Sequence, residues 1–279
     1  MYSNHQLRDY STLFTRSEMM RLLAKDFHSI NVKLERYAMS RRFKGNTYLQ
    51  FFKHAYKVLS KHYPNEYIYK NQFLNNWLKS ELGTNDSVIF SELRLGKAIA
   101  DLAMFNGISK VFEMKTILDK EYRLNRQLEV YQKVFNEVYI VVPFSQLERY
   151  QGFNEQVGII LYDDKFFHLE RPATTNYDLD PTQLMEILHT REYRQLVLDH
   201  YGVLPEMNAF TQFDQCKELI SQIPASDLNS LFIQAMKQRK SKQKFLKKAH
   251  IEFNQICLSL NLSTKQLDSL VANLNTQIT

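Results

Sequence analysis

Residues 98–116 read AIADLAMFNGISKVFEMKT. Two apolar segments, Ala98–Phe105 and Val111–Thr116, flank the dipeptide Asn106-Gly107, which is a strong signal for a tight β-hairpin turn. The two segments are therefore predicted to be neighbouring antiparallel strands. An aspartate stands inside the first strand, and a glutamate and a lysine stand inside the second.

The sequence around this hairpin alternates between strand-like and helix-like segments. Four further strands and two helices are predicted: a strand at Ser87–Leu95, a helix at Lys120–Phe135, a strand at Val138–Val142, a helix around Gln146–Gln156, and strands at Val157–Tyr162 and Lys165–Leu169. The run VYIVV at 138–142 is apolar throughout, which is typical of a fully buried parallel strand. The order β-β-β-α-β-α-β-β predicts an α/β fold with a mixed central sheet.

Helical sequences flank the predicted sheet on both sides. The expected C-terminal helices are Pro181–Tyr201, Phe213–Ile223, Asp227–Gln238, a long basic helix to about Leu260, and Ser263–Leu274. We therefore divide the chain into a basic helical N-terminal region at 1–84, an α/β core at 85–175 and a C-terminal helical region at 176–279.

The chain has 279 residues and a net charge of +6, and its basic residues cluster. Bases outnumber acids before residue 80, and the run 237–248 contains no acid; its lysines include Lys240, Lys244, Lys247 and Lys248. Such runs either contact a polyanion or form solvated helix faces.

Several classes of protein are disfavoured by the sequence. It contains no apolar run of about 18 residues and no secretory signal, so we expect a cytoplasmic protein that does not enter membranes. Cys216 and Cys257 form no CxxC pair, which argues against an iron–sulfur or structural zinc site. Motifs of P-loop ATPases, zinc proteases and serine hydrolases are missing from the sequence.

Charged residues inside the hairpin indicate a chemical site. Glu113 and Lys115 are two apart and share a strand face, whereas Phe112 and Met114 point the other way. The turn brings Asp101 close to Glu113. Burying these groups is costly unless they pair with one another or bind a cation. A salt-bridge cluster is one explanation; a Mg²⁺ site of one or two carboxylates is the other.

Asp101, followed by the triplet Glu113-Met114-Lys115, resembles the signature of the PD-(D/E)XK nuclease superfamily, which has a restriction-endonuclease-like fold. Gln127 and Tyr131, in QLEVY, resemble the Q-x-x-x-Y helix motif of its RecB-like branch. The wider stretch from ELRLG to VYIVV resembles a bacterial branch of uncharacterised nuclease-like proteins. Ala100 stands where the superfamily's signature has a proline, and many members of the superfamily lack this proline.

The resemblance implies a role for each matching residue. Asp101, Glu113 and the Met114 carbonyl would bind Mg²⁺ or Mn²⁺, and Lys115 would position or activate the attacking water. Glu92, in SELRLG, lies where related sequences carry an acid before the aspartate; it is either a third carboxylate of the site or a surface acid.

Four residues of the expected helix at 120–135 complete the set of candidates. Gln127 and Tyr131 would support the site or touch the nucleic-acid backbone, although core packing explains Tyr131 equally well. Arg123 and Arg126 either contact phosphates or are solvated.

The function expected from these features is a metal-dependent nuclease that hydrolyses phosphodiester bonds, with DNA as its partner, in phage defence or mobile-element processing. A homo-oligomer or a partner protein would supply target recognition. The first alternative is a non-catalytic nucleic-acid-binding or assembly subunit that retains the nuclease fold. The second is a structural protein whose charges simply pair.

Overall fold

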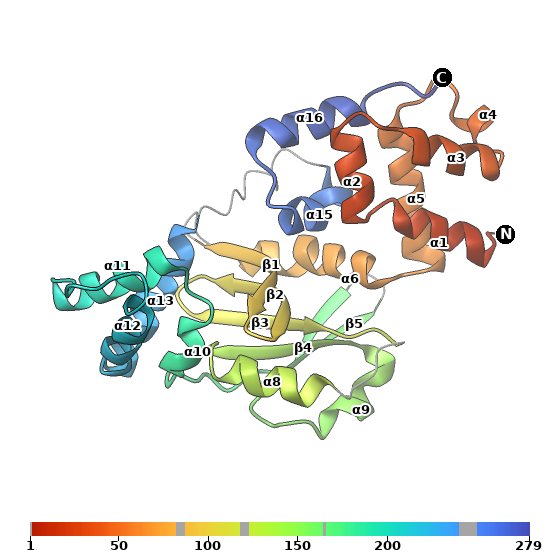
Figure 1. Ribbon diagram of the computed structural model, residues 1–279. Coiled ribbons are helices and arrows are strands. Elements are labelled where there is room, and N and C mark those ends of the chain that lie inside the picture. The colour runs from red at the N-terminus through yellow and green to blue at the C-terminus, as the bar shows by residue number, and fades with distance from the viewer. Residues whose placement is uncertain (1, 82–86, 118–122, 164–165, 240–249) are drawn as a thin grey trace. The chain divides into compact units, whose positions relative to one another are not determined.

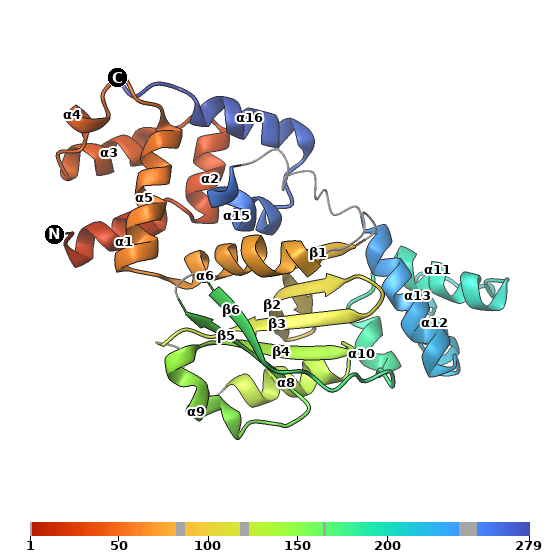
Figure 2. The same cartoon turned by 180° about the vertical axis from the view of Figure 1, so that it is seen from behind.

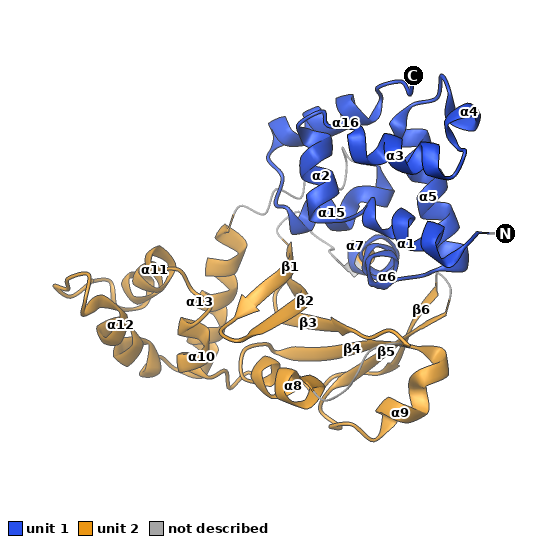
Figure 3. Cartoon of the chain, turned by 45° about the vertical axis from the view of Figure 1, so that its right-hand side comes forward, with its two compact units in different colours: residues 1–79, 242–279 blue, residues 80–241 orange. Residues whose placement is uncertain are grey.

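The computed structural model describes residues 2–81, 87–117, 123–163, 166–239 and 250–279. The chain divides into two compact units (Figure 3). Unit 1 comprises Met1–Lys79 and Lys242–Thr279, and unit 2 comprises Ser80–Ser241. This grouping differs from the division of the sequence at 84 and 175, because most of the helices after residue 175 belong with the sheet and the last ones belong with the N-terminal helices.

Unit 2 is built on a six-stranded mixed sheet in which the strands follow sequence order (Figure 1). The strands are β1 (Val88–Leu95), β2 (Ala98–Phe105), β3 (Ser109–Met114), β4 (Glu137–Pro143), β5 (Gly158–Asp163) and β6 (Phe166–Arg171). The first three form an antiparallel meander, β4 and β5 run parallel to β3, and β6 returns antiparallel. Seen from behind, β6 lies beside β5 at the edge of the sheet (Figure 2). The predicted α/β class with a mixed sheet is confirmed.

Two helices connect the parallel strands and cover one face of the sheet. They are α8 (Leu124–Gln132), between β3 and β4, and α9 (Leu147–Gln151), which follows the 3₁₀ turn η3 (Phe144–Gln146). Leu128 of α8 and Tyr150 of α9 join Ile140 and Val142 of β4 in one apolar core. All five residues of VYIVV are buried, and their strand is parallel to both neighbours, as its composition predicts.

The described residues of unit 2 form four more helices: α10 (Pro181–Met185), α11 (Thr190–Tyr201), α12 (Gln212–Ser221) and α13 (Ala225–Gln238). The single helix expected at Pro181–Tyr201 is wrong, because the chain forms two helices there. A second start is created at His189, whose backbone N–H donates to the Glu192 carboxylate at 2.7 Å in a capping box.

A buried asparagine ties these helices to the sheet. Asn136 Oδ1 accepts a hydrogen bond from the Ser109 N–H (2.8 Å) at the start of β3. Its Nδ2 donates to the Asn176 carbonyl and to Asn229 Oδ1 of α13, both at 2.8 Å. Because each polar atom of the Asn136 amide has a partner, burial of this group carries no unpaid desolvation.

Unit 1 is helical. The elements of its described residues are α1 (Asn4–Thr12), α2 (Arg16–Leu23), α3 (His28–Arg36), α4 (Ser40–Phe43), α5 (Tyr48–His62), α6 (Glu66–Phe73), the π-helical turn η1 (Leu74–Leu78), η4 (Ile251–Phe253), α15 (Asn254–Ser259) and α16 (Thr264–Leu274). The short α7 (Lys79–Glu81) spans the boundary with unit 2. None of the described helices combines the length and apolar character needed to cross a membrane.

Within unit 1, hydrogen bonds connect the C-terminal segment to the N-terminal helices and loops. Ile278 exchanges backbone hydrogen bonds with the loop before α5, donating to the Asn46 carbonyl (2.8 Å) and accepting from Gly45 (3.1 Å). Asn273 of α16 donates to the Leu22 carbonyl at 2.9 Å. The basic helix expected to reach Leu260 falls partly on residues 240–249, so Lys240, Lys244, Lys247 and Lys248 lie outside the described residues.

Candidate active site

The hairpin of β2 and β3 brings Asp101 and Glu113 together. Leu102 pairs with Phe112, and continuing this antiparallel register by one residue sets Asp101 opposite Glu113. Directly opposite residues project to the same face of a sheet. The turn contains Gly107 at φ +117°, a conformation that suits glycine. Asp101 Oδ2 accepts the Met114 backbone N–H at 2.8 Å, so its carboxylate lies against β3.

Three side chains converge on the carboxylate of Glu113, which is only 3% exposed. Lys115 Nζ donates to Oε1 at 2.8 Å, and Gln127 Nε2 donates to the same oxygen at 3.0 Å. The Tyr131 hydroxyl lies 2.9 Å from Oε2. Lys115 of the strand motif and Gln127 and Tyr131 of the helix motif therefore all contact the Glu113 carboxylate.

Electrostatics at this carboxylate are unusual. Burial and, next in size, the negative charge of Asp101 raise the pKa of Glu113 to about 7, although the Lys115 ammonium opposes the rise. A carboxyl that titrates near neutrality is the pattern expected at a functional site or a cation site. The effect of Asp101 on this pKa also means that the two carboxylates are close enough to repel one another.

Tyr131 packs in the core and also reaches the Glu113 carboxylate. Its ring is fully buried and meets Phe135 edge-on, with centroids 6.4 Å apart. Its hydroxyl nevertheless lies 2.9 Å from both the Glu113 carboxylate and the Ile99 carbonyl. Burial and the Glu113 charge hold the pKa of Tyr131 well above its usual value, so it stays a neutral hydrogen-bonding group.

Glu92 occupies a strained position on the neighbouring strand. Ser91 pairs with Leu102 and Leu93 pairs with Ala100, so the register places Glu92 across from Asp101. Its backbone is left-handed, at φ +56°, which costs a residue with a side chain about 1–3 kcal/mol. Glu92 is exposed. Strain of this kind persists where surrounding structure imposes it, and it clusters at functional sites.

The pairing of β1 with β2 changes character at Glu92 and Asp101. Before Glu92, Val88 faces the core, and after Glu92, Leu93 and Leu95 do, so the inward-facing positions of β1 shift from even to odd numbers. A local irregularity of this kind re-aims side chains, as bulges beside active sites do. This irregularity could not be predicted from the sequence, because the strand contains no glycine or proline at that point.

The donor set fits one hard divalent cation. Mg²⁺ needs only one or two carboxylates, with water and substrate phosphate for the remainder. Asp101 and Glu113 supply two, and a cation would relieve the repulsion that raises the pKa of Glu113. Among the described residues no three His, Cys, Asp or Glu side chains are grouped to hold a metal. A closed protein cage is therefore not what these residues offer.

Tyr162 of β5 is a site residue that the sequence did not indicate. Its hydroxyl donates to the Lys115 carbonyl at 3.0 Å, and Lys115 N–H donates to the Val141 carbonyl at 2.9 Å. These two bonds fix the backbone just after β3. Only the strand order β3-β4-β5 makes Tyr162 a neighbour of Lys115, and strand order is not a local property of the sequence.

Arg123 and Arg126 are exposed at the start of α8. They line a groove of about 660 Å³ together with Gln127 and the end of the β1–β2 hairpin. Both arginines therefore lie next to the residues around Glu113, as the sequence-based hypothesis of phosphate contacts requires.

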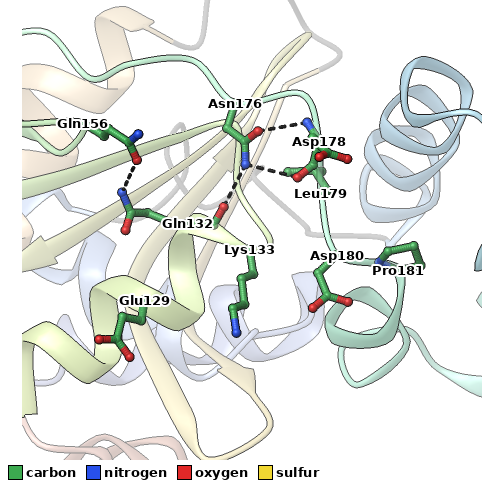
Figure 4. A pocket seen from close by; sticks show the side chains of 9 residues that line it. All are labelled: Glu129, Gln132, Lys133, Gln156, Asn176, Asp178, Leu179, Asp180 and Pro181. Atoms are coloured by element: carbon green, nitrogen blue, oxygen red, sulfur yellow. Dashed lines mark hydrogen bonds between the residues drawn. The ribbon is translucent and has the colours of Figure 1, made fainter.

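A separate pocket of about 560 Å³ lies beside the C-terminal half of α8 (Figure 4). Glu129, Lys133, Asp178 and Asp180 line it, and Asn176 Nδ2 donates to the Gln132 carbonyl at 3.0 Å on its wall. None of the candidate catalytic residues lines this pocket. We therefore place the candidate site at Glu113 and not here.

Comparison with known proteins identifies a family and gives no catalytic activity for it. No curated protein matches the chain. A solved structure titled "SPO1766 protein of unknown function from Silicibacter pomeroyi" is similar at 14% identity and a TM-score of 0.33, covering 47% of this chain and 88% of that one. The family model described as bacteriophage P4 protein cII matches residues 59–260. Because this match spans well over half of the chain, including all six strands and every candidate site residue from Glu92 to Tyr131, the protein belongs to the family of bacteriophage P4 protein cII.

Proposed function

We propose that this protein is a metal-dependent nuclease of restriction-endonuclease-like fold that hydrolyses phosphodiester bonds in nucleic acid, with DNA as the expected substrate. The observation that carries the proposal is the convergence of Lys115, Gln127 and Tyr131 on buried Glu113, directly beside Asp101. The antiparallel meander followed by a crossover helix and a parallel strand supports the proposed fold.

A plain salt bridge explains this arrangement less well. Lys115 and Glu113 alone would form a complete salt bridge, and such a bridge does not require the second carboxylate, Asp101, on the opposite strand. Like charges placed opposite each other destabilise a sheet unless something neutralises them. The register sets Glu92 and Glu113 on either side of Asp101, which concentrates negative charge where a divalent cation would be favoured.

Each residue has a chemical role in the proposed hydrolysis. Bound Mg²⁺ or Mn²⁺, with Asp101 and Glu113 as its carboxylate ligands and the Met114 carbonyl beside them, would stabilise negative charge on the phosphate and lower the pKa of water. Lys115 has three N–H donors and gives one to Glu113. The others are available to hold a water molecule in line with the phosphorus or to contact a phosphate oxygen.

Gln127 and Tyr131 act on the carboxylate and not on the substrate. Their hydrogen bonds to Oε1 and Oε2 fix the orientation of the Glu113 side chain. Preorganised ligands avoid the cost of reorganisation during the reaction. The description of the family names a bacteriophage, which supports a place in phage or other mobile-element biology.

The decisive experiment measures cleavage of single- and double-stranded DNA and RNA with Mg²⁺, Mn²⁺ or EDTA. Wild type is compared with Asp101→Asn and Lys115→Met, and Lys110→Met serves as the matched control. Lys110 lies on β3, five residues before Lys115, and also pairs with a glutamate, Glu137, at 3.2 Å. It is three residues from Glu113, the residue opposite Asp101. We expect metal-dependent cleavage that falls by about 10²–10³ in both site variants and persists in the control.

Two results would overturn the proposal. Equal cleavage by wild type and both site variants would identify a contaminating nuclease. Binding of nucleic acid without cleavage under any metal condition would instead favour the non-catalytic subunit.

A further inference from the structure

The groove beside α8 has a chemical character that the proposed reaction alone does not require. It is formed by the end of the β1–β2 hairpin, the first half of α8 and part of α10, and it encloses about 660 Å³. That volume falls within the range of about 300–1,000 Å³ typical of small-ligand pockets. The groove is thus large enough to take a nucleotide-sized group and too small for a duplex.

The groove shares its wall with the candidate active site. Gln127 lines it and also donates to Glu113 Oε1 at 3.0 Å. Ile99 lines it too, and its carbonyl lies 2.9 Å from the Tyr131 hydroxyl. A ligand in the groove would therefore rest against Gln127, which orients Glu113, and against Ile99, whose carbonyl lies beside the Tyr131 hydroxyl.

Positive charge predominates on the lining. Lys97, Arg123 and Arg126 contribute three cations, against one carboxylate, Glu186. Across the described part of the chain, neither Lys97 nor Arg126 forms an ion pair with a carboxylate. Charge of this sign and density favours phosphate groups.

The remaining surface of the groove is apolar. Leu95, Ala98, Ile99 and Val130 line it, and Ile99 is 44% exposed. A duplex presents phosphates on its outside and keeps the faces of its bases stacked, so it would leave this apolar surface in water. An unpaired nucleotide offers both a phosphate and an exposed base, and an arginine guanidinium can stack on that base.

We propose that this groove holds an unpaired nucleotide of the substrate, so that the protein acts on single-stranded nucleic acid or on single-stranded ends. Lys97 and Arg126 contact the phosphates, and Ile99 and Val130 contact the base. The inference rests on the proposed nuclease function and specifies its substrate class.

The test measures binding in EDTA, so that it does not depend on cleavage. Fluorescence anisotropy compares a labelled oligothymidylate with a labelled duplex of the same length across a series of salt concentrations. The variants are Arg126→Gln and Ile99→Ala, and the matched control is Lys133→Gln. Lys133 is an exposed cation at the other end of α8 and lines the separate pocket of Figure 4.

We expect wild type to bind the single strand more tightly than the duplex. Arg126→Gln should weaken single-strand binding and flatten the slope of log K against log salt by about 0.7, the value for one lost phosphate contact. Ile99→Ala should weaken binding up to about tenfold without changing that slope, because it removes apolar contact and no charge. Lys133→Gln should leave both quantities unchanged.

The outcomes separate the groove from the reaction. Equal affinity for both probes, or equal effects of Arg126→Gln and Lys133→Gln, would overturn the groove proposal even if the protein cleaves duplex DNA. Groove-dependent binding of the single strand, together with no cleavage in Mg²⁺ or Mn²⁺, would support the groove and refute the nuclease.

Discussion

Replacing Glu113 by glutamine should change how the stability of the protein depends on pH. Burial and the Asp101 charge raise the pKa of this carboxyl from 4.5 to about 7 in the folded protein. Between these two values the folded state binds more protons than the unfolded state, so the free energy of unfolding falls as pH rises. Above about pH 7 both states are ionised and the loss is complete.

The size of the effect follows from the shift. One pKa unit corresponds to 1.36 kcal/mol, so the rise from 4.5 to about 7 makes ionised Glu113 cost about 3 kcal/mol. Glu113→Gln removes this titration. The variant also disturbs the hydrogen bonds from Lys115 and Tyr131, which changes its stability by an amount that does not depend on the Glu113 proton.

The assay therefore follows a difference and not a single value. Urea unfolding of wild type and Glu113→Gln from about pH 5 to about pH 8 should show the stability difference moving in favour of the variant by up to about 3 kcal/mol. Gln127→Leu is the control, because it removes a partner of Glu113 and keeps the titrating group. A difference that stays constant over this range would refute the reasoning.

Further measurements bear on other parts of the structure. Above pH 7, Mg²⁺ should raise the Tm of wild type and not that of Glu113→Gln, by an amount equivalent to about 2.7 kcal/mol at a concentration of about 100 Kd; equal shifts in both proteins would exclude a cation at this carboxylate. Glu92→Gly should relieve left-handed strain and gain about 1 kcal/mol in urea unfolding while cleavage falls, whereas a loss of stability would mean that the backbone is not strained there. Tyr131→Phe should lower the free energy of unfolding by about 1–3 kcal/mol, because the buried Glu113 carboxylate loses a hydrogen bond. It should also lower kcat more than it raises KM, because the fold is retained. Unchanged kinetics would make Tyr131 a core residue only. Gly158→Ala should destabilise by about 1–3 kcal/mol, since its Cβ would lie 2.4 Å from the Tyr139 ring; a neutral effect would show that this ring can move aside.

Local features of the sequence predicted the centre of the fold well. The Asn106-Gly107 turn fixed the pairing of β2 with β3, because a short turn leaves little choice of register. The apolar run VYIVV predicted a buried parallel strand for the same kind of reason. The hairpin turn also predicted that Asp101, Glu113 and Lys115 lie in one neighbourhood.

Non-local features were out of reach. The hydroxyl of Tyr162 meets Lys115 across a sheet whose strand order cannot be read from spacing. The left-handed backbone at Glu92 is imposed by tertiary structure on a residue type that does not prefer it. Apolar periodicity also continued through His189, where a capping interaction starts a new helix. At Tyr162 and Glu92, structure distant in sequence overrides a local preference, whereas the new helix at His189 starts through a local capping interaction with Glu192.

The joining of both chain ends in one helical unit has a consequence for biosynthesis. Residues 80–241 leave the ribosome before the segment that contains α15 and α16, so the sheet unit has all of its own sequence available first. The early helices α1–α6 must wait for that segment to complete their hydrophobic core. Until then these helices expose apolar surface that a chaperone would recognise. A premature stop codon before α15 would therefore destabilise the N-terminal helices, although their own sequence would be complete.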